Sequence, residues 1–486
     1  MTQTKKRKQS LSAFTVLIIV LAVVCICSFL LNGQPIDPAI GGDITSVASA
    51  KFSDFVMAIP NGFQNASDLI IFIMAIGGFI GVVMSTGALE AGVYTLVKKM
   101  KGKEELLIAI LMFLFSLGGT TYGMAEETIG FYALVTSAMV AAGFDTMVAV
   151  GTILLGAGAG VLGSTINPFA TGAAMGALSS VGIDPNSTTI MLLGVVLWLT
   201  SLALAMWFVL SYARKVKADK GSTILSLQEQ EDMREHFSHD ESKNIEFTSK
   251  HKLILLVFGI TFVIMIASLI YYQDIVYKGD EAAFLAAFGW SDFFTGNPLG
   301  WWYFMDLAAL FIFSSVIIAV IAWMGEHEYI TRFMAGAQDL LSVALIIATA
   351  RGITVVMGVT HLDLYILDIS SKLLQGVSPL IFAPLAYIVY LPLSFLVPST
   401  SGLAGLSIPV MGSLAYTLGF NPNVMIMIFS AAIGVINYFT PTSGVVMGGI
   451  AAAKVEYSTF LKWVMKLVLL TIVANIIILS IAMMVL

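Results

Sequence analysis

The stretch GGTTYGMAEET, residues 118–128, places two adjacent carboxylates, Glu126 and Glu127, in a sequence that is otherwise almost continuously apolar. The apolar run before it, residues 106–117, is shorter than the roughly 20 residues that a helix needs to cross a bilayer core. We therefore expect a re-entrant helical hairpin whose Gly- and Thr-rich tip lines a cavity, because polar groups at membrane depth are tolerated only in a cavity or inside protein. This tip is the first candidate part of a substrate site.

The composition is that of a membrane protein. The 486 residues are 58% hydrophobic and 11% charged, which is too few charges to cover a soluble surface. No P-loop, nucleophile elbow or metal-ligand cluster is visible, so we expect neither an enzyme nor a resident cofactor. Cys25 and Cys27 share one apolar run and are expected to be packed thiols without a redox role.

The apolar runs predict an all-α polytopic membrane protein with about nine transmembrane spans. The expected spans cover residues 12–32, 67–88, 146–180, 187–213, 252–273, 302–324, 338–359, 423–456 and 459–485. The first follows the basic segment TQTKKRKQS without a convincing cleavage site, so we expect a retained helix that enters from the cytoplasm.

Two hydrophilic stretches, the part of residues 1–66 that follows the first span and residues 214–251, are expected to lie outside the membrane. Residues 1–66 would hold the first span and an extracellular loop. Residues 214–251 mix acids and bases closely and are expected to form a cytoplasmic linker. His236 and His239 in this linker have no third ligand in view, so we expect them to be solvated.

Two of the spans are interrupted, and two hairpins accompany them. The interruptions read GSTINPFATG at residues 163–172 and NYFTPTSG at residues 437–444. Proline and glycine there remove helical hydrogen bonds, which predicts two discontinuous helices at 146–180 and 423–456. One hairpin is expected at 104–143 and a second, with the tip VPSTSGLAG, at 377–418. An amphipathic interfacial segment precedes each of them.

These elements form an inverted repeat. Residues 67–213 and 302–486 both contain a span, an interfacial helix, a hairpin, a broken helix and a further span. The connecting span at 252–273 reverses the second half, so the two hairpins open to opposite sides. All but four of the 24 Lys and Arg residues fall in or beside expected cytoplasmic segments, in agreement with the positive-inside rule. This pattern indicates an alternating-access carrier, with a channel as the alternative.

The tip GGTTYGMAEET, the break STINPFATG and the opening SAFTVLIIV resemble the YfcC branch of the C4-dicarboxylate anaerobic carrier (DcuC-type) family over nearly the whole chain. Within that branch the chain is similar to the arginine-ornithine antiporters of lactic bacteria. The wider group resembles the ion transporter superfamily. This resemblance implies two hairpins, a scaffold domain that dimerises, a transport domain that moves, and a possible sodium requirement.

The charges favour a basic amino acid over a dicarboxylate. Glu126 and Glu127 align with Gly405 and Leu406 in the second half, so the repeat fold does not require them. An anionic cavity repels a dianion and attracts a guanidinium or ammonium group. Apart from lysines near the span ends, Arg351 is the one basic residue inside an expected span, and it is a candidate partner for a substrate carboxylate. The alternatives are that a glutamate caps the hairpin or carries a coupling proton, and that Arg351 pairs structurally.

Hydroxyl and amide side chains gather at the tips and breaks. They could bind a carboxylate together with helix amino termini, coordinate sodium, or satisfy the interrupted helices. They are Thr120, Thr121, Ser164, Thr165 and Asn167 in the first half, and Ser399, Thr400, Ser401, Asn437, Thr440, Thr442 and Ser443 in the second. For Tyr122 and Tyr438 the sequence leaves two alternatives, which are stacking on a substrate guanidinium and packing in the protein interior.

The sequence therefore predicts a secondary transporter of amino acids, with arginine and ornithine exchange as the favoured activity. The alternatives are a sodium- or proton-coupled carrier of C4-dicarboxylates or peptides, a channel, and a membrane enzyme that acts on lipids. We expect a homodimer in the plasma membrane with a cytoplasmic N-terminus, a basic amino acid as ligand, and no nucleic-acid partner.

Overall fold

The computed structural model describes residues 13–237, except 90, 93, 94 and 96–102, and residues 247–486, except 271 and 278. The described part is helical, with a single isolated bridge between Pro35 and Ser46 as its only extended pairing. Eight helical stretches within it are long and apolar enough to cross a bilayer. The chain is thus an all-α polytopic membrane protein, as the sequence predicts.

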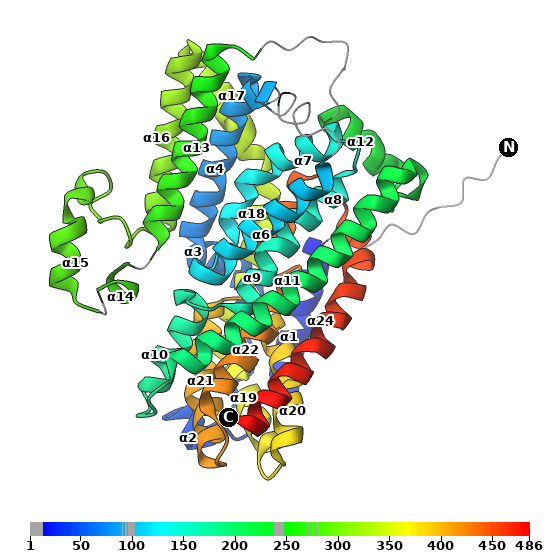
Figure 1. Ribbon diagram of the computed structural model, residues 1–486. Helices are drawn as coiled ribbons and strands as arrows, with labels where there is room; N and C mark the ends of the chain where they lie inside the picture. The colour runs from blue at the N-terminus through cyan, green and yellow to red at the C-terminus, as the bar shows by residue number, and fades with distance from the viewer. Residues whose placement is uncertain are drawn as a thin grey trace.

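The first half contains the following elements in chain order (Figure 1): α1 (Ala13–Leu30), α2 (Pro38–Gly41), α3 (Phe52–Asn65), α4 (Ser67–Ser85), α6 (Glu104–Tyr122), η1 (Glu126–Phe131), α7 (Tyr132–Ala141), α8 (Thr146–Val150), η2 (Gly151–Leu155), α9 (Gly156–Gly163), η3 (Pro168–Gly172), α10 (Ala173–Ser179) and α11 (Ser187–Ala218).

The linker and the second half continue with η4 (Lys220–Ser222), α12 (Leu227–Phe237), α13 (Ser249–Leu269), α14 (Tyr272–Ile275), α15 (Glu281–Phe288), η5 (Gly289–Phe293), α16 (Phe304–Ala322), α17 (Glu326–Asp339), α18 (Leu341–Thr360), α19 (Leu362–Leu374), α20 (Pro379–Leu396), α21 (Thr400–Thr417), α22 (Pro422–Ile436), α23 (Gly444–Ala452) and α24 (Tyr457–Val485).

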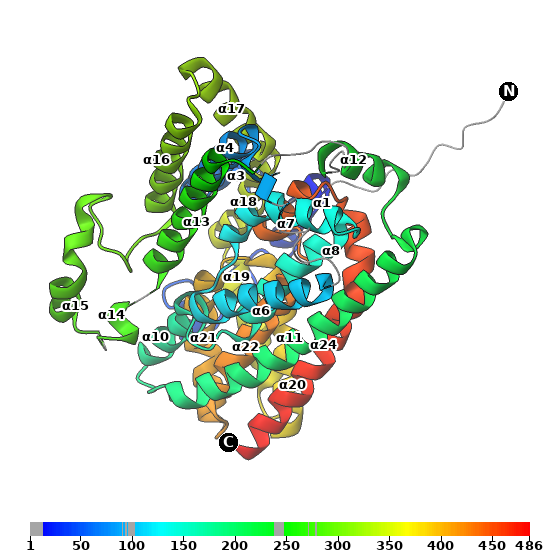
Figure 2. The same ribbon diagram turned by 45° about the horizontal axis from the view of Figure 1, so that its top comes forward.

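The helices form two groups that meet along the centre of the molecule. In the first group α3 packs against α18, while α4 packs against α16 and α17. In the second group α6, α11 and α22 pack around α9, while α20 and α24 pack on α22. Figures 1 and 2 show the first group on one side, with α13 and α16 beside α4, and the long helices α11 and α24 on the other.

The first hairpin has unequal arms. Its first arm, α6, has 19 residues and ends at Gly123, whose φ of 80° lies in the left-handed region that glycine favours. Such a helix is about 28 Å long, so α6 is longer than the apolar run at 106–117 predicts and approaches the thickness of a bilayer core. The apolar run ends at Leu117, but residues 118–122 continue the helical hydrogen bonding. The second arm consists of η1 and the ten-residue α7.

Both predicted breaks interrupt helices. The first helix runs through α8, η2 and α9 and stops at Ser164, whose φ is 40°. It resumes at η3 and α10 after residues 165–167. The second break separates α22 from α23 over residues 437–443.

The inverted repeat is longer than the sequence suggested, because an amphipathic helix precedes a span in each half. Helix α3 was expected to be part of the extracellular loop within residues 1–66, and no element was predicted for most of α17, because the mixed polarity of both helices hides them from a search for apolar runs. Each crosses a span of the opposite half at a glycine. A Cβ on Gly62 would lie 1.9 Å from the Ala348 carbonyl oxygen, and one on Gly336 would lie 2.2 Å from that of Gly77. The two crossings are counterparts in the repeat.

The linker at 214–251 is only partly a solvated segment. Helix α11 extends to Ala218, and α12 folds back onto the amino end of α24. The Glu229 carboxylate is 2% exposed and accepts hydrogen bonds from the Glu456 amide at 2.8 Å and the Thr459 hydroxyl at 3.1 Å. A carboxylate from another helix therefore caps α24, which a reading of local periodicity could not foresee. His239 and most of the first interfacial segment lie outside the described residues.

We expect Gly62→Ala to lower the free energy of unfolding by about 1–3 kcal/mol, because its Cβ would meet backbone that cannot move aside. The measurement is the thermal unfolding of the detergent-solubilised protein. Gly259→Ala in α13 is the matched control, since nothing lies within 4 Å of its Cβ. Equal stability of the two variants would contradict the close crossing of α3 and α18.

Candidate substrate site between the hairpin tips and the helix breaks

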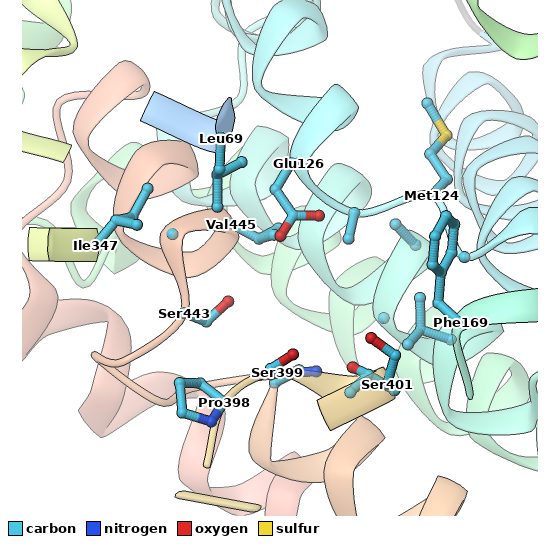
Figure 3. A pocket seen from close by; sticks show the side chains of 18 of the residues that line it. Leu69, Met124, Glu126, Phe169, Ile347, Pro398, Ser399, Ser401, Ser443 and Val445 are labelled. Carbon is cyan, nitrogen blue, oxygen red and sulfur yellow. The ribbon is translucent and has the colours of Figure 1, made fainter. Parts of the chain in front are cut away.

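A cavity of about 150 Å³ lies where the two helix groups meet. Its walls come from both hairpin tips, both breaks, α9, α18 and the ends of α4, α13 and α16. Each water in the liquid occupies roughly 30 Å³, so the cavity has room for about five waters or one small metabolite. Figure 3 shows Glu126 on one wall and Ser399 and Ser401 on the wall opposite.

The structure brings about half of the predicted site residues to this cavity. The residues that line it are Glu126, Asn167, Arg351, Ser399, Thr400, Ser401, Asn437, Thr442 and Ser443. Those that lie outside its lining are Thr120, Thr121, Ser164, Thr165, Tyr438 and Thr440. The side chains of Tyr122 and Glu127 lie outside the described part of the structure.

Thr120 and Thr165 join the first hairpin tip to the first break. The Thr165 amide donates to the Thr120 hydroxyl oxygen at 3.1 Å, and the Thr165 hydroxyl donates to the Thr120 carbonyl at 3.0 Å. Thr121 instead donates to the Leu117 carbonyl of its own helix at 2.7 Å. The Thr120 and Thr165 contacts satisfy backbone groups at the break, whereas the Thr121 hydroxyl makes an i−4 bond within continuous helix α6.

Ser164 and Asn167 hold the first break in shape. The Asn167 amide nitrogen donates to the Ser164 hydroxyl at 3.0 Å, and the Thr171 hydroxyl donates to the carbonyls of both residues at 3.0 Å. Ser164 also donates to the Val161 carbonyl. Asn167 nevertheless lines the cavity, so it connects the fold of the break to the site.

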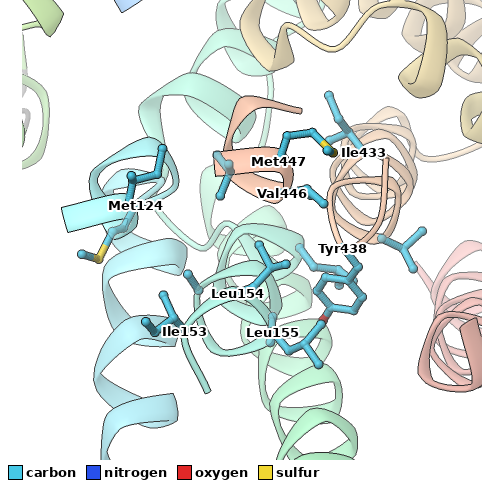
Figure 4. Packing of buried hydrophobic residues seen from close by; sticks show 14 of the residues in the cluster. Met124, Ile153, Leu154, Leu155, Ile433, Tyr438, Val446 and Met447 are labelled. Carbon is cyan, nitrogen blue, oxygen red and sulfur yellow. The ribbon is translucent and has the colours of Figure 1, made fainter. Parts of the chain in front are cut away.

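In the second break, hydroxyls also bond to one another and to the neighbouring hairpin. The Thr440 and Thr442 hydroxyls lie 2.7 Å apart, and that of Thr442 lies 3.3 Å from the Phe395 carbonyl at the end of α20. Tyr438 is fully buried near Leu154 and Leu155 (Figure 4) and is not among the residues that line the cavity. Its ring belongs to the buried core behind the cavity wall, which includes Leu154 and Gly158.

Glu126 and Arg351 face the cavity from different helix groups. Glu126 lies at the start of η1 in the first hairpin, whereas Arg351 lies in α18 of the second half. They are close enough to interact electrostatically. No ion pair within 4.0 Å connects these two described side chains. They are the only charged residues among the described residues that line the cavity. The cavity thus presents one anionic and one cationic group to the same ligand.

Two helix amino termini add to the positive side of the cavity. Helix α21 begins at Thr400, and the Ser399 hydroxyl accepts a hydrogen bond from the Gly402 amide at 3.3 Å. Helix α23 begins at Gly444, and the Ser443 side chain makes no capping bond to it. Amino-terminal amides carry partial positive charge and favour an anionic group. The second hairpin and second break therefore suit a carboxylate, while Glu126 suits a cation.

Sequence reasoning missed the apolar wall. Phe169 and Tyr303 line the cavity with their ring centroids 5.9 Å apart, together with Leu69 and Leu269. Phe169 lies inside the quoted break and could have been included. Tyr303 lies at the start of the apolar span expected at 302–324, directly before α16, so no local pattern marks it as a site residue.

The fold and this cavity define a membrane carrier, with hairpins and broken helices around one central site. The chain belongs to the C4-dicarboxylate anaerobic carrier family, which it matches over residues 9–484. It is therefore a secondary transporter and an integral membrane protein.

Relatives and solved structures extend this comparison. An uncharacterised Haemophilus influenzae protein is 31% identical over 418 residues, which cover 85% of this chain and 75% of that protein. The Escherichia coli K12 protein named "Putative basic amino acid antiporter YfcC" is 26% identical over 414 residues, which cover 82% of this chain and 74% of that protein.

Two solved transporter structures also align. The YdaH transporter of Alcanivorax borkumensis is 13% identical with a TM-score of 0.45, and the alignment covers 96% of this chain and 97% of that one. MtrF of Neisseria gonorrhoeae is 14% identical with a TM-score of 0.42, and the alignment covers 99% of this chain and 96% of that one.

Proposed function

We propose that this transporter exchanges arginine for ornithine by alternating access. The observation that carries the proposal is that Glu126 and Arg351 line one small cavity without an ion pair between them. A basic amino acid supplies the missing partner to each, because it carries a carboxylate at one end and a cation at the other. The antiporter name of the relative YfcC also supports a basic amino acid.

The two ends of the substrate bind to different parts of the site. The α-carboxylate pairs with Arg351 and with the amino termini of α21 and α23, where Ser399, Ser401 and Ser443 add hydroxyl groups. The side-chain guanidinium or ammonium group pairs with Glu126, since a planar guanidinium matches a carboxylate in two parallel hydrogen bonds. Phe169 and Tyr303 cover the aliphatic stem between them.

The balance of charge explains exchange. Arginine and ornithine each carry one net positive charge at neutral pH, so a one-for-one exchange moves no net charge across the membrane. Such a cycle needs neither an ion gradient nor a bound sodium ion. The tip and break hydroxyls are then free to bind substrate or to satisfy backbone groups.

A second candidate is a sodium- or proton-coupled C4-dicarboxylate carrier, which the description of the family favours. A dianion needs two cationic partners, and Arg351 is the only cationic residue among the described residues that line the cavity. Sodium at the break hydroxyls would supply the second positive charge. In its sodium-coupled form this candidate therefore predicts a strict sodium requirement, and in its proton-coupled form it predicts uptake driven by a proton gradient.

Proteoliposomes loaded with ornithine should accumulate labelled arginine many-fold over empty ones, because each inward arginine needs an outward ornithine. We expect little effect of membrane potential, of sodium, or of excess succinate. The control is the same protein in liposomes loaded with succinate. Sodium-dependent uptake of labelled succinate that arginine does not inhibit, together with no exchange of arginine for ornithine, would replace this proposal by the dicarboxylate carrier.

A further inference from the structure

A second and larger cavity, of about 1270 Å³, opens at the opposite end of the long helices from the C-terminus. It lies between α11 and α24 and is covered by the segment that joins η4 to α12. Lys215 of α11 and Lys462 and Lys466 of α24 line it. No part of the transport site described above contributes to its walls.

The three lysines differ from the other basic residues at the end of α11. Arg214 pairs with Glu105 at 2.8 Å, and Lys217 pairs with Glu104 at 2.9 Å. Within the described part of the chain, by contrast, no ion pair or hydrogen bond engages the ammonium groups of Lys215, Lys462 or Lys466. One carboxylate, Glu456, shares the cavity, so the walls carry a net charge of plus two.

The cover of the cavity is held in place by buried carboxylates. Asp145 is 3% exposed and accepts hydrogen bonds from Tyr212 at 2.5 Å and Thr223 at 2.6 Å. Glu229 accepts a hydrogen bond from the Ser226 amide at 2.7 Å. The segment at 222–228 is thereby fixed over the lysines, with the hydroxyls of Ser222 and Ser226 among its lining residues.

An apolar surface continues from the lysines along both helices. On α24, Lys462 and Lys466 lie on the same helical stripe as Leu469, Val473 and Ile477, which are all more than half exposed. On α11, exposed Trp207, Leu199, Val196 and Leu192 form a similar stripe. Both helices belong to candidate membrane spans, so these stripes lie at the depth of lipid acyl chains.

We infer that this cavity binds an anionic phospholipid. The headgroup phosphate lies among the three lysines and the serine hydroxyls, the aromatic rings of Phe208 and Trp463 lie at the level of the glycerol, and the acyl chains follow the two apolar stripes. Basic pockets at the ends of membrane helices recognise acidic headgroups in this way. The apolar stripes distinguish a lipid from a soluble phosphate, which would use the lysines alone.

The test compares ligands on the delipidated full chain in detergent, by thermal shift and by native mass spectrometry. Phosphatidylglycerol should bind and raise the unfolding temperature, whereas phosphatidylcholine of the same chain length and inorganic phosphate should not. The variant Lys215→Gln/Lys462→Gln/Lys466→Gln should bind phosphatidylglycerol on the order of 100-fold more weakly, because each basic residue near an anionic headgroup contributes roughly fivefold. Each single variant should bind phosphatidylglycerol roughly fivefold more weakly. The single variants therefore test the inference even if the triple variant folds poorly.

The matched control is Lys103→Gln/Lys220→Gln/Lys252→Gln, which removes the same charge from exposed lysines outside the cavity. It should bind phosphatidylglycerol as the unaltered protein does. Equal loss in both triple variants, or equal binding of both lipids, would overturn the assignment. Saturation by inorganic phosphate at the affinity of phosphatidylglycerol would make this a soluble-anion site, and dimer loss in the cavity variant would make it a subunit interface. Each of these two results also overturns it.

Discussion

Glu126→Gln should strongly reduce arginine uptake in exchange for ornithine, with an apparent affinity for arginine about 30-fold lower or worse. The amide keeps the shape of the carboxylate but leaves a desolvated guanidinium without a counter-charge, and removing one partner of a buried charged pair costs about 2–5 kcal/mol. The unfolding temperature should stay within error, because no ion pair in the described structure uses Glu126. The measurement is the arginine dependence of uptake into ornithine-loaded proteoliposomes.

A change of substrate separates this role from that of a coupling proton. Citrulline is a neutral molecule of nearly the same shape as arginine, and Glu126→Gln should gain relative preference for it. If Glu126 only carried a proton, selectivity between arginine and citrulline would be unchanged. Glu105→Gln is the matched control, since Glu105 lies at the exposed start of the same hairpin and pairs with Arg214 at the surface. Exposed pairs contribute at most about 1 kcal/mol, so transport should persist.

The fold was largely predictable, because the elements that position the site carry strong local signals. Apolar runs mark the spans, and proline and glycine mark both breaks. Helices α3 and α17 were not predicted, because they pack through glycines, Gly62 and Gly336, rather than through apolar stretches. The length of α6 was underestimated, because Thr120 and Thr121 are polar and yet remain helical. The Thr121 hydroxyl bonds within the helix, and the Thr120 hydroxyl bonds to the adjacent break.

The candidate site was predictable only in part, for a related reason. Hydroxyl residues of the same type either bond to backbone groups at the helix breaks or line the cavity. Their position on the helix determines which of these two roles they have. Thr165 bonds to Thr120, whereas Ser401 lies on the open amino end of α21. The buried position of Tyr438 depends on the crossing of α9 and α22, which is a tertiary property. No pattern within one break could separate these cases.

If Arg351 pairs with the substrate carboxylate, as proposed, its replacement should change selectivity as well as rate. Agmatine is arginine without the carboxylate, so the unaltered protein should strongly prefer arginine. In Arg351→Gln the affinity for arginine should fall by more than tenfold, because a charge-assisted hydrogen bond contributes about 1.5–3 kcal/mol. Inhibition by agmatine should hardly change, so the ratio between the two affinities should collapse. Competition by both compounds against labelled arginine measures this ratio.

Arg351→Lys tests the geometry of the contact, since lysine keeps the charge but cannot offer the planar pair of donors. It should retain part of the preference for arginine over agmatine. Normal selectivity in Arg351→Gln would instead assign Arg351 to the structure of α18.

The positions of Glu126 and Arg351 also predict which ligands support exchange, because Glu126 belongs to a hairpin of one helix group and Arg351 to a span of the other. A substrate that bridges them connects the two groups, whereas agmatine, held at Glu126 alone, cannot. Agmatine should therefore bind without supporting exchange, and net agmatine transport at the rate of arginine would contradict this coupling.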